Sequence, residues 1–178
     1  LLTLFAGGWV SAVILTIVSL VGIKEILKVY SLDKSPFAVM DYLMTVLWYI
    51  CIYFNKAQFL LPMLLIGLLI MLAIYVCTFP KYKDKDIMRA YFALIYVAVL
   101  LSFVLQIRAM EAGLLLAFYV LISSWINDIF AYFVGSAIGK HKFSPKVSPN
   151  KSVEGFVGGV LGAGLIGFLF GFVFSEHI

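Results

Sequence analysis

The sequence predicts an all-α, polytopic integral membrane protein with about six transmembrane helices. Hydrophobic residues make up 64% of the 178 residues and charged residues 12%, whereas a soluble domain is roughly half apolar and about a quarter charged. The apolar residues also run in blocks of about 20, which is the length that a helix needs to cross the hydrocarbon core. These two observations exclude a soluble globular core.

Six apolar blocks are long enough to be spans. We expect them at residues 9–26, 37–54, 59–79, 91–107, 114–138 and 156–174. Pro36 and Pro80 mark loops and Pro62 falls in the first turn of the third span, where proline is tolerated. Residues 1–6 are apolar too, and we expect them to end an earlier, truncated span. Residues 1–178 are then a single transmembrane helical domain and a fragment of a longer protein, whose catalytic C-terminal segment would follow residue 178.

The number of basic residues is high and low in alternate loops. In and beside the five loops, lysine and arginine number three, one, four, one and four, and the tail after the sixth span has none. Cytoplasmic loops carry an excess of these residues, so the first, third and fifth loops are expected in the cytoplasm. The scattered lysines lack an interleaved aromatic platform, which argues against nucleic acid as a partner.

A carboxylate lies inside the fifth span. Asp128 follows Leu114 by about 14 residues, which is roughly 21 Å at 1.5 Å per residue in a core of about 30 Å. A charge there costs roughly 2.5–3.5 kcal/mol and usually serves a function. The structural alternative is that Asp128 pairs with a lysine at a helix contact and that Asn127 is an amide joining two helices.

Small and polar residues recur on the last two spans with helical spacing. On the fifth span one stripe is small or polar, and the stripe beside it contains Asp128. The first stripe is Ser123, Asn127, Ala131, Gly135 and Gly139, and the second is Ser124, Asp128, Tyr132 and Ser136. The sixth span has three Gly-x-x-x-Gly pairs, which favour close helix packing; they are Gly155/Gly159, Gly158/Gly162 and Gly167/Gly171.

The longest polar stretch, residues 139–152, joins the last two spans. Ser148-Pro149 predicts a helix start, with serine as N-cap and proline at the first helical position. Free N–H groups at a helix N-terminus bind phosphate, and Lys151 and Ser152 would point toward the same anion. The alternative is a solvated basic loop that merely follows the charge bias of cytoplasmic loops.

An ordered set of motifs in this region resembles bacterial phosphatidate cytidylyltransferase. It consists of Asn127-Asp128-x-x-Ala131-Tyr132-Phe133-x-Gly135, Gly139-Lys140-His141-Lys142, Ser148-Pro149-x-Lys151-Ser152-x-Glu154-Gly155 and Gly158-Gly159. The strong match covers about residues 125–162, and Gly7-Gly8-Trp9 with Glu25 fits that family's first hairpin and next helix. The chain departs from the family at Ile129, usually threonine, and at Val153, usually tryptophan. The family's C-terminal Lys-Asp and His-Gly-Gly motif does not occur in residues 1–178.

The resemblance implies transfer of the cytidylyl group of CTP to phosphatidate, giving CDP-diacylglycerol and pyrophosphate. It implies Mg²⁺ as cofactor, a multi-pass position in the cell inner membrane, an active site facing the cytoplasm, and phosphatidate drawn from the inner leaflet; a homo-oligomer is left open. It assigns Asp128 to the metal and to catalysis, and Lys151 to catalysis. The residues implied for substrate binding are Asn127, Lys140, Lys146, Ser148, Ser152 and Glu154.

Two other interpretations of these residues stay open at this point. A related CTP-dependent lipid kinase or CDP-archaeol synthase would share the aspartate and the lysines. A non-enzymatic transporter would use Asp128 as an ion site, with no dependence on CTP.

Overall fold

The computed structural model describes residues 7–144 and 148–174. In these residues six helices are long and apolar enough to cross a membrane, which confirms the predicted class, a multi-pass helical membrane protein. Contacts divide the chain into two compact units, Leu1–Ala109 (unit 1) and Met110–Ile178 (unit 2). Each is described by itself, and the single-domain assignment stays a prediction.

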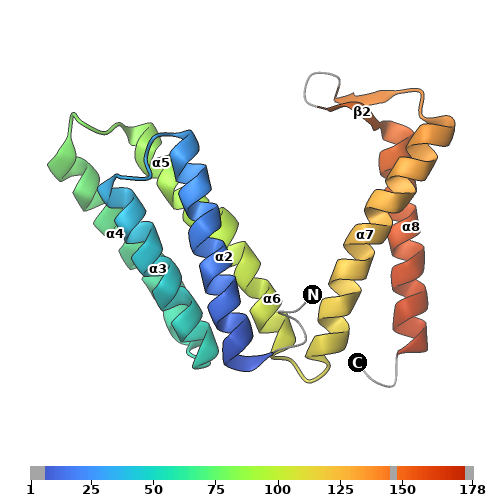
Figure 1. Ribbon diagram of the computed structural model, residues 1–178, viewed down its shortest axis with the longest axis horizontal. Helices are drawn as coiled ribbons and strands as arrows, with labels where there is room; N and C mark the ends of the chain where they lie inside the picture. Colours follow the sequence, from blue (N-terminus) through green and yellow to red (C-terminus); the bar gives the residue numbers. More distant parts are fainter. Residues whose placement is uncertain (1–6, 145–147, 175–178) are drawn as a thin grey trace. The chain divides into compact units, whose positions relative to one another are not determined.

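Unit 1 holds the first four spans (Figure 1). Its elements are α2 (Gly8–Val29), α3 (Pro36–Tyr53), the 3₁₀ turn η1 (Ala57–Phe59), α4 (Leu60–Thr78), α5 (Asp84–Ala93), the π-helical turn η2 (Leu94–Val99) and α6 (Leu100–Arg108). The first three spans lie close to their expected positions. Ser35 caps α3 by accepting a hydrogen bond from the Ala38 N–H at 3.3 Å, and Pro36 takes the first helical position, where it loses no hydrogen bond.

The fourth span is longer than hydropathy predicts. It begins at Asp84 rather than at residue 91, and it continues through α5, η2 and α6 to Arg108. Asp86 accepts a hydrogen bond from the Lys83 N–H at 2.9 Å and pairs with Arg89 at 3.3 Å. Acidic residues in a first turn favour the helix because they face its positive end. An apolar-run criterion misses such a turn because the turn is polar.

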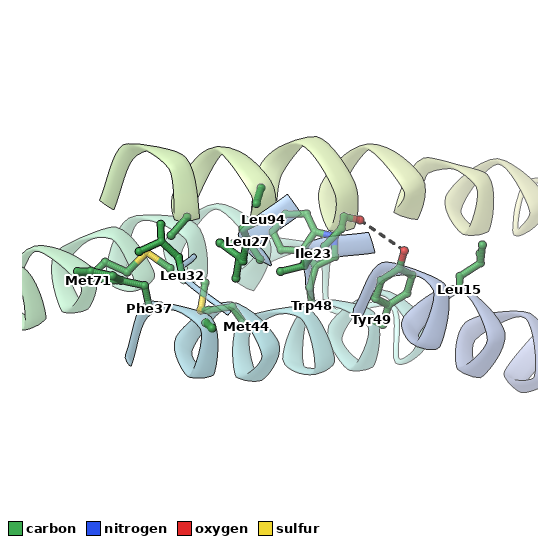
Figure 2. Packing of buried hydrophobic residues seen from close by; sticks show 14 of the residues in the cluster. Leu15, Ile23, Leu27, Leu32, Phe37, Met44, Trp48, Tyr49, Met71 and Leu94 are labelled. Carbon is green, nitrogen blue, oxygen red and sulfur yellow. Dashed lines mark hydrogen bonds between the residues drawn. The ribbon is translucent and has the colours of Figure 1, made fainter. Parts of the chain in front are cut away.

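The core of unit 1 lies between these helices, and Figure 2 shows its largest members. The fully buried ones include Ile23, Leu27, Phe37, Met71 and Leu94. Several polar groups near them are paired: Trp48 Nε1 donates to Ser102 Oγ at 2.9 Å, and Ser19 Oγ bonds with Tyr49 Oη at 2.9 Å. Such interhelical bonds satisfy polar groups that neither lipid nor apolar side chains could.

Contacts near the helix ends show which ends of the helices lie together in unit 1. The Arg89 guanidinium lies 4.6 Å from the centre of the Tyr30 ring, and the Phe37 and Tyr82 rings meet edge-on at 5.3 Å. The first and third basic loops are therefore at the same end of the unit, as the charge counts require. Which side of the membrane this end faces stays a prediction.

Unit 2 is a pair of helices joined by a β-hairpin (Figure 1). It consists of α7 (Gly113–Ile138), β1 (Lys142–Ser144), β2 (Ser148–Ser152) and α8 (Val153–Val173), with β1 and β2 antiparallel. The expectation of a helix start at Ser148-Pro149 is wrong. Both residues belong to β2, and α8 begins at Val153 with Ser152 as its N-cap. Residues 148–152 form a strand because they pair with β1. Local helix signals do not reveal this pairing.

Candidate functional site

The packing of α7 against α8 positions the candidate site. The small stripe of α7 faces the glycines of α8. The spacing predicted a small face on the first helix and close packing by the second, but not that the two would meet. A Cβ on Gly155 would lie 2.6 Å from the Ala131 carbonyl oxygen and 3.0 Å from Gly135 Cα, and one on Gly159 would lie 2.7 Å from Asn127 Oδ1. The glycines at positions 155 and 159 are therefore required for this approach. A Cβ added at Gly164 or Gly171 would meet no neighbouring segment within 4 Å among the described residues, so packing at Gly171 stays a prediction.

Asn127 belongs to this helix contact. Its side-chain oxygen points at the place where Gly159 lacks a Cβ, and its side chain is partly buried. This geometry fits the structural alternative, an amide that joins two helices. A substrate-binding role for Asn127 stays a prediction.

Asp128 lies on the neighbouring, exposed face of α7. The whole second stripe is exposed, namely Ser124, Asp128, Tyr132 and Ser136. Asp128 is 10 residues before Ile138, or about 15 Å along the axis from the end of the helix that carries the hairpin. Its carboxylate is therefore presented inside the span on a polar stripe that leads toward the hairpin.

Ser152 connects the hairpin to the helix pair. Its hydroxyl oxygen accepts a hydrogen bond from the Gly155 N–H at 3.1 Å, which makes it the N-cap of α8. The residue is buried, and a Cβ on Gly135 would lie 3.0 Å from that oxygen. The structure thus gives Ser152 a capping partner; hydrogen bonding to a substrate stays a prediction.

Glu154 joins the first turn of α8 to the segment that leaves α7. Its carboxylate accepts hydrogen bonds from the backbone N–H of Lys140 at 3.1 Å and of His141 at 3.2 Å. One oxygen also lies 2.6 Å from His141 Nδ1. The Val153 N–H donates to the His141 carbonyl oxygen at 2.9 Å and closes the same junction. The carboxylate therefore holds the base of the hairpin in place.

The hairpin presents a basic surface at this end of unit 2. Lys140, Lys142 and Lys151 are exposed, and Ser148 is partly buried on β2. Lys151 lies two residues before α8 begins, at the positive end of this helix. Both a lysine and a helix N-terminus favour an anion. Lys146, also expected to bind substrate, lies outside the described residues.

A sequence model of the Cytidylyltransferase family matches residues 1–178. The chain belongs to this family. Over 83 residues it is 32% identical to the phosphatidate cytidylyltransferase of Aquifex aeolicus (strain VF5), a match that covers 47% of this chain and 30% of that protein. Over 67 residues it is 40% identical to the phosphatidate cytidylyltransferase of Thermotoga maritima, covering 38% of this chain and 24% of that protein. The matches thus span less than a third of each relative's length.

A metal ion would find few protein ligands among the described residues. In residues 7–144 and 148–174 no three His, Cys, Asp or Glu side chains come together as a metal-binding group. Asp128 alone still fits Mg²⁺ chemically, because this ion is often held by one or two carboxylates together with substrate phosphates and water. Glu154 is the poorer candidate ligand, since its oxygens are already bonded to Lys140 and His141.

Two residues of the structure were given no role from the sequence. His141 is exposed, as expected, yet its ring pairs with Glu154. Asp41 on α3 is fully buried, and neither of its oxygens finds a hydrogen-bond partner in the part of the chain that the structure describes. Neither the His141–Glu154 contact nor the burial of Asp41 has a signal in sequence spacing, because each depends on how distant segments pack.

Proposed function

We propose that the protein containing this chain transfers the cytidylyl group of CTP to phosphatidate, giving CDP-diacylglycerol and pyrophosphate. Membership of the cytidylyltransferase family supports the reaction type. The observation that supports the substrates most directly is in unit 2. A carboxylate on an exposed stripe within a span, and lysines on the hairpin at the end of that span, suit a reaction between a soluble triphosphate and a lipid headgroup.

In this reaction a phosphate oxygen of phosphatidate attacks the α-phosphorus of CTP. The bond between that phosphorus and the oxygen bridging to the β-phosphate breaks, and pyrophosphate leaves. Such transfers depend chiefly on positioning and on neutralising charge. Lys140 and Lys151 are exposed and would neutralise triphosphate or lipid phosphate, while Glu154 would keep the lysine-bearing hairpin in position.

Asp128 is the residue that would hold a divalent cation. Bound Mg²⁺ neutralises phosphate oxygens and orients them for in-line displacement. The exposed position of Asp128 leaves its oxygens open toward further ligands, which would come from substrate phosphates, water and carboxylates beyond the described residues.

The location of this chemistry follows from the charge bias. The loops with many lysines, including the hairpin, are proposed to face the cytoplasm, with the chain in the inner membrane of a bacterial cell. CTP would then approach the hairpin from the cytoplasm, and phosphatidate would enter from the inner leaflet.

An assay with CTP labelled on either the α- or the γ-phosphate tests this function. Purified full-length protein in vesicles with phosphatidate and Mg²⁺ should transfer the α-label to lipid and release the γ-label as pyrophosphate. Transfer of the γ-label to lipid would show a lipid kinase instead. Preference for an unsaturated ether lipid acceptor would show a CDP-archaeol synthase. Ion flux without label transfer would show a transporter.

A further inference from the structure

Two aromatic side chains meet on the outside of unit 2. Phe143 on β1 and Phe156 on α8 stack with ring centroids 5.3 Å apart and an interplanar angle of 23°. The contact therefore lays the first strand of the hairpin against the first turn of the helix. We call these two residues the aromatic step.

The aromatic step is not core packing. Phe143 and Phe156 are each 55% exposed, so the contact covers less than half of either side chain. Exposing such a surface to water forfeits about 25 cal/mol for each Å² of apolar area that another apolar phase could cover. Phe143 is also the one large apolar side chain among residues 142–144 and 148–152, the described part of the hairpin. An exposed apolar group at this position requires a partner.

The partner follows from where Phe156 lies. It is the fourth residue of α8, which is long and apolar enough to span the membrane, so it sits about 4.5 Å into the span at 1.5 Å per residue. Phenylalanine, like tryptophan and leucine, is typical of the apolar faces that enter the boundary between headgroups and acyl chains. The neighbours of Phe156 on the outer side of α8, Val157 and Val160, are exposed apolar residues as well. Phe143 extends this lipid-facing surface onto the hairpin.

The charges around the aromatic step match the same partner. Lys142 precedes Phe143 on β1, Lys151 lies on the paired strand β2, and both are exposed. A lysine near an anionic membrane surface contributes about 1 kcal/mol of attraction. Aromatic groups that enter the interface, with lysines beside them at headgroup level, are typical of interfacial anchors.

We propose that the aromatic step is a membrane-interface anchor that seats the hairpin on the headgroups of anionic lipids. Phe143 and Phe156 enter the boundary between headgroups and acyl chains, and Lys142 and Lys151 contact lipid phosphate. The hairpin is then held by two contacts: Glu154 from α8 and the lipid surface beneath Phe143. This inference requires only unit 2 in a bilayer and does not depend on the reaction proposed above.

Site-specific labelling tests the anchor. Phe143→Cys and Phe156→Cys are each made in the full-length protein lacking Cys51 and Cys77. Each variant keeps the other phenylalanine of the aromatic step. A nitrobenzoxadiazole dye is attached, and the protein is placed in vesicles of phosphatidylethanolamine and phosphatidylglycerol. Fluorescence is then quenched either by lipids with a nitroxide high on the acyl chain or by aqueous iodide. The matched control is Asn150→Cys, an exposed polar position on β2 of the same hairpin.

We expect the labels at positions 143 and 156 to be quenched several-fold more by the nitroxide lipid than the label at position 150, and less by iodide. Iodide quenching at either position equal to that at Asn150→Cys would overturn the proposal. Protection of the position 143 label by CTP with Mg²⁺, without quenching by lipid, would also overturn it and would assign the aromatic step to the nucleotide base.

Discussion

Glu154 shows how one side chain can hold a segment of backbone in place, while its predicted role in substrate binding stays a prediction. Its carboxylate bonds to two backbone N–H groups and to the ring of His141, all in the segment that leaves α7. Carboxylates that accept several hydrogen bonds in this way fix backbone geometry, because a charged acceptor forms shorter and stronger bonds than a neutral one. The lysines on the hairpin therefore take their position from an acid on α8.

Replacing Glu154 by alanine should loosen the base of the hairpin while leaving the helix pair intact. Without the carboxylate, the N–H groups of Lys140 and His141 lose their acceptor, and we expect their amide exchange to speed up several-fold. Hydrogen–deuterium exchange on the peptide that contains both residues measures this. Glu111→Ala, at an exposed acid in the same unit, is the matched control. Equal exchange in the two variants would show that Glu154 does not hold the hairpin.

Replacing Asp41 should stabilise the protein, because this carboxylate is buried without a hydrogen-bond partner in the described part of the chain. A buried unsatisfied polar group costs about 1–3 kcal/mol, and a charged one costs more. Asp41→Asn keeps the size of the side chain and removes the added cost of the charge, so it should raise the free energy of unfolding in detergent by about 1 kcal/mol or more. Glu111→Gln, at an exposed position between α6 and α7, should leave it unchanged. If Asp41→Asn lowered stability, Asp41 would have a stabilising partner that the described residues do not include.

At the scale of elements, the contact between α7 and α8 depends on glycines, which have no side chain. At Gly155 the approach is to backbone atoms: a Cβ there would lie 2.6 Å from the Ala131 carbonyl oxygen. A carbonyl in a helix cannot move aside as a flexible side chain can, so the two helices would have to separate. Only glycine permits the observed distance at this position.

Gly155→Ala should accordingly destabilise the helix pair by about 1–3 kcal/mol, the usual cost of overpacking. Gly164→Ala is the matched control on the same helix, since nothing lies within 4 Å of its added methyl. It should be neutral or stabilise by up to about 1 kcal/mol through helix propensity. Thermal unfolding followed by circular dichroism compares the two. Equal midpoints for both variants would contradict the close approach at Gly155.

Two of the three Ser-Pro pairs in the sequence show how far sequence reasoning reaches for such elements. Ser35-Pro36 does begin a helix, because a long apolar run follows it. Ser148-Pro149 carries the same local signal but is followed by Asn150-Lys151-Ser152, which pairs with β1. The small-residue stripe of α7 and the glycine pairs of α8 were predictable because helical spacing is local. The hairpin and the Glu154 contacts were not, because they arise only when residues 140–144 return to α8.

At the scale of the whole molecule, the charge alternation predicts an orientation that the structure supports in part. In unit 1 the loops before α3 and before α5 lie at the same end, joined by the Arg89–Tyr30 contact. Single cysteines replacing Lys28 or Lys85 should therefore react with an impermeant reagent only after permeabilisation of cells, in a variant lacking Cys51 and Cys77.

The control for orientation is Lys56→Cys, an exposed position in the loop between α3 and α4. It should react from outside in intact cells, because one helix separates it from each basic loop. Labelling of Lys85→Cys in intact cells would reverse the orientation and place the candidate site outside.

Asp128 is the residue that we propose to hold a divalent cation during transfer from CTP to phosphatidate. The most direct measurement is the rate of CDP-diacylglycerol formation by full-length Asp128→Asn across a Mg²⁺ titration, beside Ser124→Ala on the same exposed stripe. The amide keeps the size of the side chain and removes the charge that the ion requires. We expect a loss of about a hundredfold or more in kcat/KM, the scale of losing an electrostatic contact to a developing charge, and near-normal rates for Ser124→Ala. Near-normal turnover of a monodisperse Asp128→Asn protein at every Mg²⁺ concentration would contradict the account.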